Sequence, residues 1–437
     1  MIALTAGALA LTGLSWLTTP ALADPPVANP KAPVSWEVPD IGRVVLVEDH
    51  RAPLVEVRLH FPAGAWSPWF RESGGEEAFN MQIYDPEGSL RARVDALAAD
   101  MDLGSDDFGA TLTFSCLKED LADGLELIQD VIYNRDYDPS ELKRAKKGRT
   151  VAWEGQIKDP SFRLEQAGRE LLFAAGDPRL DGYEEPTPMV TDVAKLSDVR
   201  NTLVRLPGRT VGFAGDLNRA EIDELVVGLL PPVEAGPDNL APTFSPLNTD
   251  RPPLTQVPMP TLTQVYFALG RESLPWTHED YAAMLVASHV LGGHFYSRLY
   301  LSLRHDGGET YGAGARFAGG PEPGPYGLTT FTRVENAERT EEKLRAVLDT
   351  FHADGITQEE LDAAVGNLMG ERAFSQQAPG QVLDDWLWES ARGLPAGWRE
   401  SMAERAGAMD LEAVNAFITD FYDPAKFVMV RVEPEVK

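Results

Sequence analysis

Alternating apolar and polar positions mark the candidate strands of this chain. The clearest runs place Val55, Val57, Leu59 and Phe61 on one face, and later Val265, Phe267 and Leu269. Such alternation is typical of a strand that has one face in a core. Two further apolar runs, at residues 210–215 and 427–432, also predict strands.

Helical spacing appears between these strands, and it appears twice. Leu125, Ile128 and Val131 recur at helical intervals, and Asp138 or Ser140 then offers an N-cap for the next helix. The same pattern recurs 219 residues later in the chain, where Thr357 occupies the capping position. The repeated apolar and capping positions are Leu344, Val347, Phe351, Thr357, Glu360 and Leu361.

Three matching segments in the same order predict an internal duplication. The expected fold class is α+β, with two homologous lobes, each a mainly antiparallel sheet with helices packed on one face. Nine prolines in residues 231–260 predict a linker. The expected domains are therefore a first lobe at 36–230 and a second lobe at 261–437.

The first 23 residues carry no charged side chain and end in Ala21-Leu22-Ala23, a small-x-small pattern. This segment predicts a signal peptide that is cleaved before Asp24, and hence a periplasmic or secreted protein with no stable membrane span after cleavage. The alternative is a membrane anchor, although Gly, Ser, Thr and Pro interrupt the apolar run.

Charge and cysteine content narrow the possible partners. A formal net charge of −29 disfavours binding to nucleic acid and to anionic lipid surfaces. Cys116 is the only cysteine, so no disulfide can form within the chain.

The second predicted lobe contains a distinctive motif. Residues 291–299 read Leu-Gly-Gly-His-Phe-Tyr-Ser-Arg-Leu, followed by Leu303-Arg304 and, seven residues after the Arg, Tyr311-Gly312. The motif resembles the second-lobe signature of the pitrilysin/insulinase family of two-lobed zinc peptidases. In that family the Arg and Tyr bind the substrate backbone and stabilise the oxyanion at the zinc site, so the resemblance implies this role for Arg304 and Tyr311. The alternative is that Arg304 pairs with a helix end and Tyr311 packs on a strand.

The first lobe lacks the residues that the same family uses for zinc. Family members carry H-x-x-E-H on a helix, with two His ligands and a Glu base, and a further Glu ligand about 75 residues later. After Gly64 and the pair Gly74-Gly75, this slot falls on Glu77-Ala78-Phe79-Asn80-Met81, and no such motif occurs elsewhere in the chain.

The residues in this slot are poor substitutes for the lost ones. Met81 offers only a neutral thioether, and Asn80 cannot accept a proton at neutral pH. Glu77 retains a carboxylate, and Glu154 is a candidate remnant of the distant ligand. The alternative, a weakly held hard cation between Glu77 and Glu154, would leave that cation mostly hydrated.

We therefore expect a non-catalytic subunit of a secreted zinc metalloendopeptidase pair, inactive alone and active only with its partner. This chain would hold no cofactor. It would form a heterodimer with a peptidase homologue that carries the zinc ion. It would supply Arg304 and Tyr311 and help to enclose extended peptides. The alternatives are a scaffold or peptide-binding homologue without a role in proteolysis, and an autonomous hydrolase, for which no G-x-S-x-G motif is found.

Overall fold

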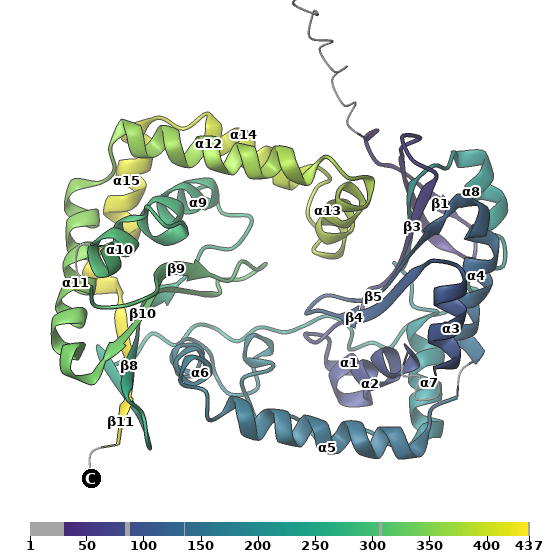
Figure 1. The fold of residues 1–437 in the computed structure, drawn as a ribbon, viewed down its shortest axis with the longest axis horizontal. Coiled ribbons are helices and arrows are strands. Elements are labelled where there is room, and N and C mark those ends of the chain that lie inside the picture. Colours follow the sequence, from purple (N-terminus) through teal and green to yellow (C-terminus); the bar gives the residue numbers. More distant parts are fainter. Residues whose placement is uncertain (1–29, 84–87, 135, 306–307, 436–437) are drawn as a thin grey trace, which may run out of the picture.

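The structure is a computed structural model that describes residues 30–83, 88–134, 136–305 and 308–435. The predicted signal peptide, residues 1–23, lies outside the described residues. Two sheets organise the chain, one from the first half and one from the second. Figure 1 shows the two lobes beside each other, the first in purple to teal and the second mostly in green to yellow.

The first sheet has six strands in the order β1-β2-β6-β3-β5-β4. The β2–β6 pair is parallel and the other neighbours are antiparallel. The predicted strands at residues 55–61 and 210–215 lie within β3 and β6. The strands are β1 (Val34–Val38), β2 (Gly42–Glu48), β3 (Leu54–Phe61), β4 (Asp100–Ser105), β5 (Ala110–Leu117) and β6 (Thr210–Gly215).

The second sheet has five strands in the order β7-β11-β8-β10-β9, and the β7–β11 pair is parallel. Without β1, the first sheet follows the same plan, so β2–β6 corresponds to β7–β11. This agreement confirms two homologous lobes with mainly antiparallel sheets. The strands are β7 (Leu254–Met259), β8 (Gln264–Glu272), β9 (Ala313–Phe317), β10 (Pro325–Arg333) and β11 (Val428–Pro434).

Strand β7 was not expected, because it falls within the Pro-rich segment assigned to the linker. It lies at the edge of its sheet and pairs only with β11, so Pro258 has no second neighbouring strand that needs its missing N–H. The segment therefore combines a connection with the first strand of the second sheet.

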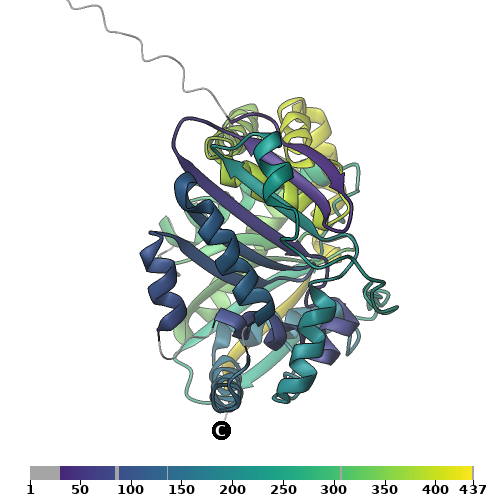
Figure 2. The same ribbon diagram turned by 90° about the vertical axis from the view of Figure 1, so that its right-hand side faces the viewer.

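Helices of each half pack on one face of that half's sheet, and Figure 2 shows those of the first lobe in front of its strands. The predicted caps are present: Asp138 accepts from the Ser140 N–H at the start of α5, and Thr357 forms a capping box with Glu360 at the start of α12. The helices of the first half are α1 (Pro68–Ser73), α2 (Gly75–Asn80), α3 (Ser89–Ala96), α4 (Leu121–Gln129), α5 (Pro139–Gln156), α6 (Pro160–Leu172), α7 (Val193–Leu203) and α8 (Arg219–Leu225). Those of the second half are α9 (Tyr281–Ser288), α10 (Arg298–Tyr300), α11 (Ala337–Asp354), α12 (Gln358–Ser375), α13 (Pro379–Ala391), α14 (Trp398–Gly407) and α15 (Leu411–Phe421).

The opposite face of each sheet receives a helix from the other half. Helix α13 buries Leu383 against β2 and β6, and α6 buries Leu164 against Val430 and Val432 of β11. Figure 1 shows α5 and α6 reaching toward the second lobe, while α12 and α13 reach back toward the first. The two lobes are therefore joined by exchanged helices as well as by the connecting chain. Among the described residues, no helix is long and apolar enough to cross a bilayer.

Candidate functional site

Two glycines shape the chain around the degenerate zinc motif. A Cβ at Gly64 would lie 2.2 Å from the Asp106 carbonyl oxygen, so this turn can approach the β4–β5 connection only without a side chain. Gly74 ends α1 and begins α2 with φ of 87°, a left-handed conformation that glycine adopts without strain. These glycines turn the chain so that α2 buries Ala78 and Phe79.

Glu77 is buried on α2, and its carboxylate has an arginine partner. Arg149, near the middle of α5, donates from Nη1 to Glu77 Oε1 across 2.6 Å. Burial raises the pKa of Glu77, and the positive charge of Arg149 opposes that rise. The pair therefore places a guanidinium beside the one acidic side chain that remains in the motif.

The other motif positions provide no further ligands around Glu77. The Oδ1 atom of Asn80 is buried and has no hydrogen-bond partner among the described residues. Met81 packs against an apolar cluster that includes Ala78 and Leu196. Glu154 is exposed on α5, five residues beyond Arg149 and hence about 7.5 Å farther along the helix axis.

This donor set does not fit zinc. Within the described ranges, no group of three His, Cys, Asp or Glu side chains is placed to hold a metal ion. The guanidinium of Arg149 would also repel a cation that approached Glu77. The expectation that zinc belongs to a partner stays a prediction.

The second-lobe motif builds a turn with exposed aromatic side chains. The chain passes from the π-helical segment His289–Gly293 through α10 into a second π-helical segment, Leu301–His305, which carries Arg304. Such π segments occur frequently at functional sites. Arg304 is exposed, donates to the Tyr300 hydroxyl and has its guanidinium 4.8 Å from the centre of that ring.

Tyr311 follows Arg304 by seven residues and is 77% exposed. Its hydroxyl makes no hydrogen bond within the described part of the chain. Arg298, by contrast, forms two hydrogen bonds of 2.7 Å to Glu360, which fix the start of α12. No side-chain hydrogen bond or ion pair among the described residues connects Arg304 or Tyr311 to Glu77 or Arg149.

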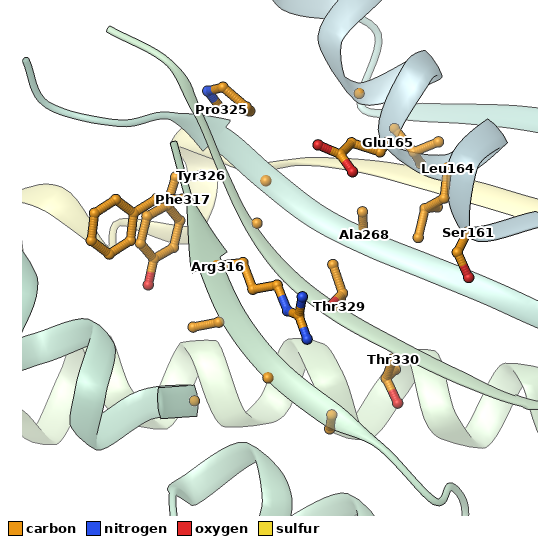
Figure 3. A pocket seen from close by; sticks show the side chains of 18 of the residues that line it. Ser161, Leu164, Glu165, Ala268, Arg316, Phe317, Pro325, Tyr326, Thr329 and Thr330 are labelled. Carbon is orange, nitrogen blue, oxygen red and sulfur yellow. The ribbon is translucent and has the colours of Figure 1, made fainter. Parts of the chain in front are cut away.

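A cavity of about 860 Å³ opens between α6 and the second sheet. Tyr300 and Tyr311 contribute to its lining, whereas Arg304 does not. Figure 3 shows the sheet floor of this cavity with Arg316 and Thr329, and Leu164 and Glu165 on the α6 side. Sequence reasoning missed the cavity because its walls come from both halves of the chain.

Known proteins resemble this chain in sequence and in fold. Residues 192–368 match the family model described as Peptidase M16 inactive domain, M16 being the pitrilysin/insulinase family. A Helicobacter pylori protein named non-peptidase homolog YmxG is 21% identical over 394 residues, which cover 86% of this chain and 88% of that protein. The chain is similar to members of the M16 family, and the family model matches less than half of the chain.

Other relatives match this chain over shorter lengths. A Bacillus subtilis protein named uncharacterized zinc protease YmxG is 27% identical over 162 residues, which cover 36% of this chain and 39% of that protein. The alignment therefore spans well under two thirds of that relative.

Solved structures share the fold of this chain. A structure from Pseudomonas fluorescens, described as a peptidase M16 inactive domain, superposes with a TM-score of 0.78 at 21% identity, covering 93% of this chain and 98% of that one. The periplasmic protease PqqL from Escherichia coli gives a TM-score of 0.73 at 15% identity and covers 99% of this chain but 49% of its own.

These findings and the altered motif together support a non-catalytic M16 homologue. Sequence reasoning had named Glu77, Asn80, Met81 and Glu154 as degenerate positions, but it missed Arg149. The available signal was a basic residue five positions before Glu154, whose approach to α2 only the tertiary structure determines.

Proposed function

We propose that this chain is the non-catalytic subunit of an M16 zinc peptidase pair in the periplasm or outside the cell. The ion pair between Arg149 and Glu77 carries the proposal, because it neutralises the last carboxylate of the motif with a cation built into the chain. A zinc-bearing homologue would then perform the hydrolysis. The location rests on the predicted signal peptide in residues 1–23.

Arg304 and Tyr311 are the residues that this subunit would supply to its partner. Both are exposed, so both can meet a surface that belongs to another chain. A guanidinium and a neutral phenol are suitable donors for the oxyanion of a tetrahedral intermediate. Exposed edge strands, such as β4, could also pair with the backbone of an extended peptide.

A second function is a scaffold or peptide-binding role without proteolysis. The contact of Arg304 with Tyr300 favours it, since this arginine already has a partner within its own lobe. The Helicobacter pylori relative is also named a non-peptidase homolog. This alternative differs from the first in requiring no zinc-bearing partner.

Mixing the purified chain with a zinc-bearing M16 homologue from the same genome tests the proposal. We expect fluorogenic peptides to be cleaved by the mixture and not by this chain alone. Arg304→Ala and Tyr311→Phe should lower the activity of the mixture while leaving assembly, measured by size-exclusion chromatography, unchanged. If the mixture assembles and its activity is unchanged by both substitutions, Arg304 and Tyr311 do not have the proposed role. If the two chains do not assemble, the scaffold function is favoured.

A further inference from the structure

The cavity between α6 and the second sheet has the size and lining of a ligand site. Its volume of about 860 Å³ falls within the range of roughly 300–1,000 Å³ that is usual for small-molecule and cofactor sites. Leu164 and Leu171 of α6 line it together with Val428 and Val430 of β11 and other apolar side chains. The space is open to solvent and predominantly apolar.

The strand register explains the depth of the cavity floor. Gly270 of β8 pairs with Gly327 of β10, which pairs in turn with Arg316 of β9. The next row on the same face contains Ala268, Thr329 and Gly314. A Cβ at Gly327 would meet nothing closer than 3.9 Å, so the absence of a side chain there leaves empty space above the sheet.

The charge of the cavity is opposite in sign to that of the protein. The chain has a formal net charge of −29, yet three arginines and one glutamate line this cavity. Arg169 pairs with Glu165 at 3.0 Å, and Arg271 pairs with Glu272 at 2.9 Å. Arg316 is exposed and has no hydrogen-bond or ion-pair partner among the described residues, so its guanidinium is available to a ligand.

We propose that this cavity binds the apolar C-terminal segment of an extended peptide, with the terminal carboxylate on Arg316. A guanidinium matches a carboxylate with two parallel hydrogen bonds, and the apolar walls accept the side chains beside it. That peptides reach the cavity rests on the proposed function.

Thr329 favours a peptide over a fatty acid as the occupant. It stands in the row next to Arg316, and Figure 3 shows both on the cavity floor. Its hydroxyl makes no hydrogen bond within the described ranges, so it can accept the N–H that precedes a peptide carboxylate. A fatty acid has no such N–H to offer.

Calorimetric titration of the isolated chain tests the carboxylate contact. The probes are the peptide Ala-Leu-Phe-Leu with a free C-terminus, the same peptide with a C-terminal amide, and dodecanoate. We expect the free acid to bind roughly 10- to 100-fold more tightly than the amide, and Arg316→Gln to remove that difference. Equal affinity for acid and amide, or an unchanged preference in Arg316→Gln, would overturn the proposal, as would tighter binding of dodecanoate than of the free peptide.

A second substitution tests whether the apolar side chains of the peptide lie in the cavity. Gly168 of α6 lines the cavity, and a Cβ there would meet nothing within 4 Å, so Gly168→Leu should fill the space without disturbing the core. We expect Gly168→Leu to lower the affinity for the peptide with a free C-terminus at least tenfold. Gly148→Leu, at an equally open glycine of α5 outside the cavity, should not. Equal binding by both variants would place the peptide elsewhere.

These titrations need no partner subunit, so their result is separate from that of the mixing experiment. Specific peptide binding by the isolated chain together with an inactive mixture would retain the cavity assignment and reject the trans-acting role. An active mixture, with no such peptide binding by the isolated chain, would retain the trans-acting role and reject the cavity assignment.

Discussion

Arg149 on α5 donates to the Glu77 carboxylate on α2 across 2.6 Å, so that two helices distant in sequence are joined at the degenerate zinc motif. Glu77 occupies the position that the family resemblance aligns with the first zinc ligand. Its carboxylate is buried, and the only positive charge that the structure pairs with it among the described residues is that of the guanidinium. The guanidinium neutralises this carboxylate at a position where the family motif has a neutral histidine ligand.

Replacing Arg149 by Met should destabilise the first lobe. The substitution leaves a buried carboxylate without its partner, and because Arg149 itself is partly exposed, we expect a loss of roughly 1–3 kcal/mol in the free energy of unfolding. Urea denaturation at pH 7 measures this change. The double variant Glu77→Gln/Arg149→Met should recover much of the loss, because neither charge then remains unpaired.

Lys147→Met is the matched control for that series, since Lys147 is exposed on the same helix. It should leave the unfolding free energy within about 0.5 kcal/mol of the starting protein. If Arg149→Met behaved like this control, the ion pair would contribute nothing measurable.

The exchanged helix α13 should stabilise the first sheet from outside its own half. Leu383 is fully buried against β2 and β6, and a Cβ at Gly212 would lie 2.8 Å from its Cδ1, which shows how closely the helix lies on the sheet. Truncation of a buried leucine to alanine typically costs about 2–5 kcal/mol. We expect Leu383→Ala to increase hydrogen exchange in β2 and β6, which are more than 160 residues earlier in the chain. Faster exchange in the second sheet alone would contradict this coupling.

His60 should make the protein sensitive to acid. Burial lowers the pKa of His60 to about 4, and one ring nitrogen has no partner among the described residues. In the unfolded chain this imidazole takes up its proton near pH 6.5, so stability from this group falls as pH decreases from about 6.5 toward 4, by up to roughly 3 kcal/mol.

His60→Gln should flatten that part of the stability profile. Unfolding free energies measured between pH 4 and pH 8 would check this, with His278→Gln at a partly exposed position as the control. An unchanged slope below pH 6.5 in His60→Gln would show that other groups cause the acid sensitivity.

Arg392 should restrain the two lobes relative to each other. It pairs with Asp106 of the β4–β5 connection at 2.9 Å, and its guanidinium lies 4.3 Å from the centre of the Phe108 ring and 4.4 Å from that of Trp388. We expect Arg392→Met to cost roughly 1–2 kcal/mol and to increase the radius of gyration in small-angle X-ray scattering. Arg333→Met, at a largely exposed arginine on β10, should change neither quantity.

Local patterns in the sequence identified much of the fold correctly. Alternation identified β3 and β8, and the caps at Asp138 and Thr357 marked the starts of α5 and α12, because strand alternation and helix capping depend on neighbouring residues. The duplication followed from the same local signals. Strand β7 was missed because its proline, Pro258, is tolerated only through the position of the strand at a sheet edge, which the sequence does not reveal.

The candidate site was predicted less completely, because its decisive contacts join distant segments. The sequence located Glu77, Asn80 and Met81, yet 72 positions separate Glu77 from its partner Arg149. The cavity around Arg316 depends on the register of β8, β9 and β10 and on a helix from the other lobe. Such relationships follow from the packing of the whole chain.

Metal analysis combined with a peptidase assay on the isolated chain tests the central claim most directly. The protein would be incubated with zinc, passed over a desalting column, and then examined by mass spectrometry for bound metal and with fluorogenic peptides for cleavage. With Arg149 paired to Glu77, we predict no stoichiometric zinc and no cleavage that a chelator inhibits. One tightly bound zinc per chain together with chelator-sensitive cleavage would contradict the account.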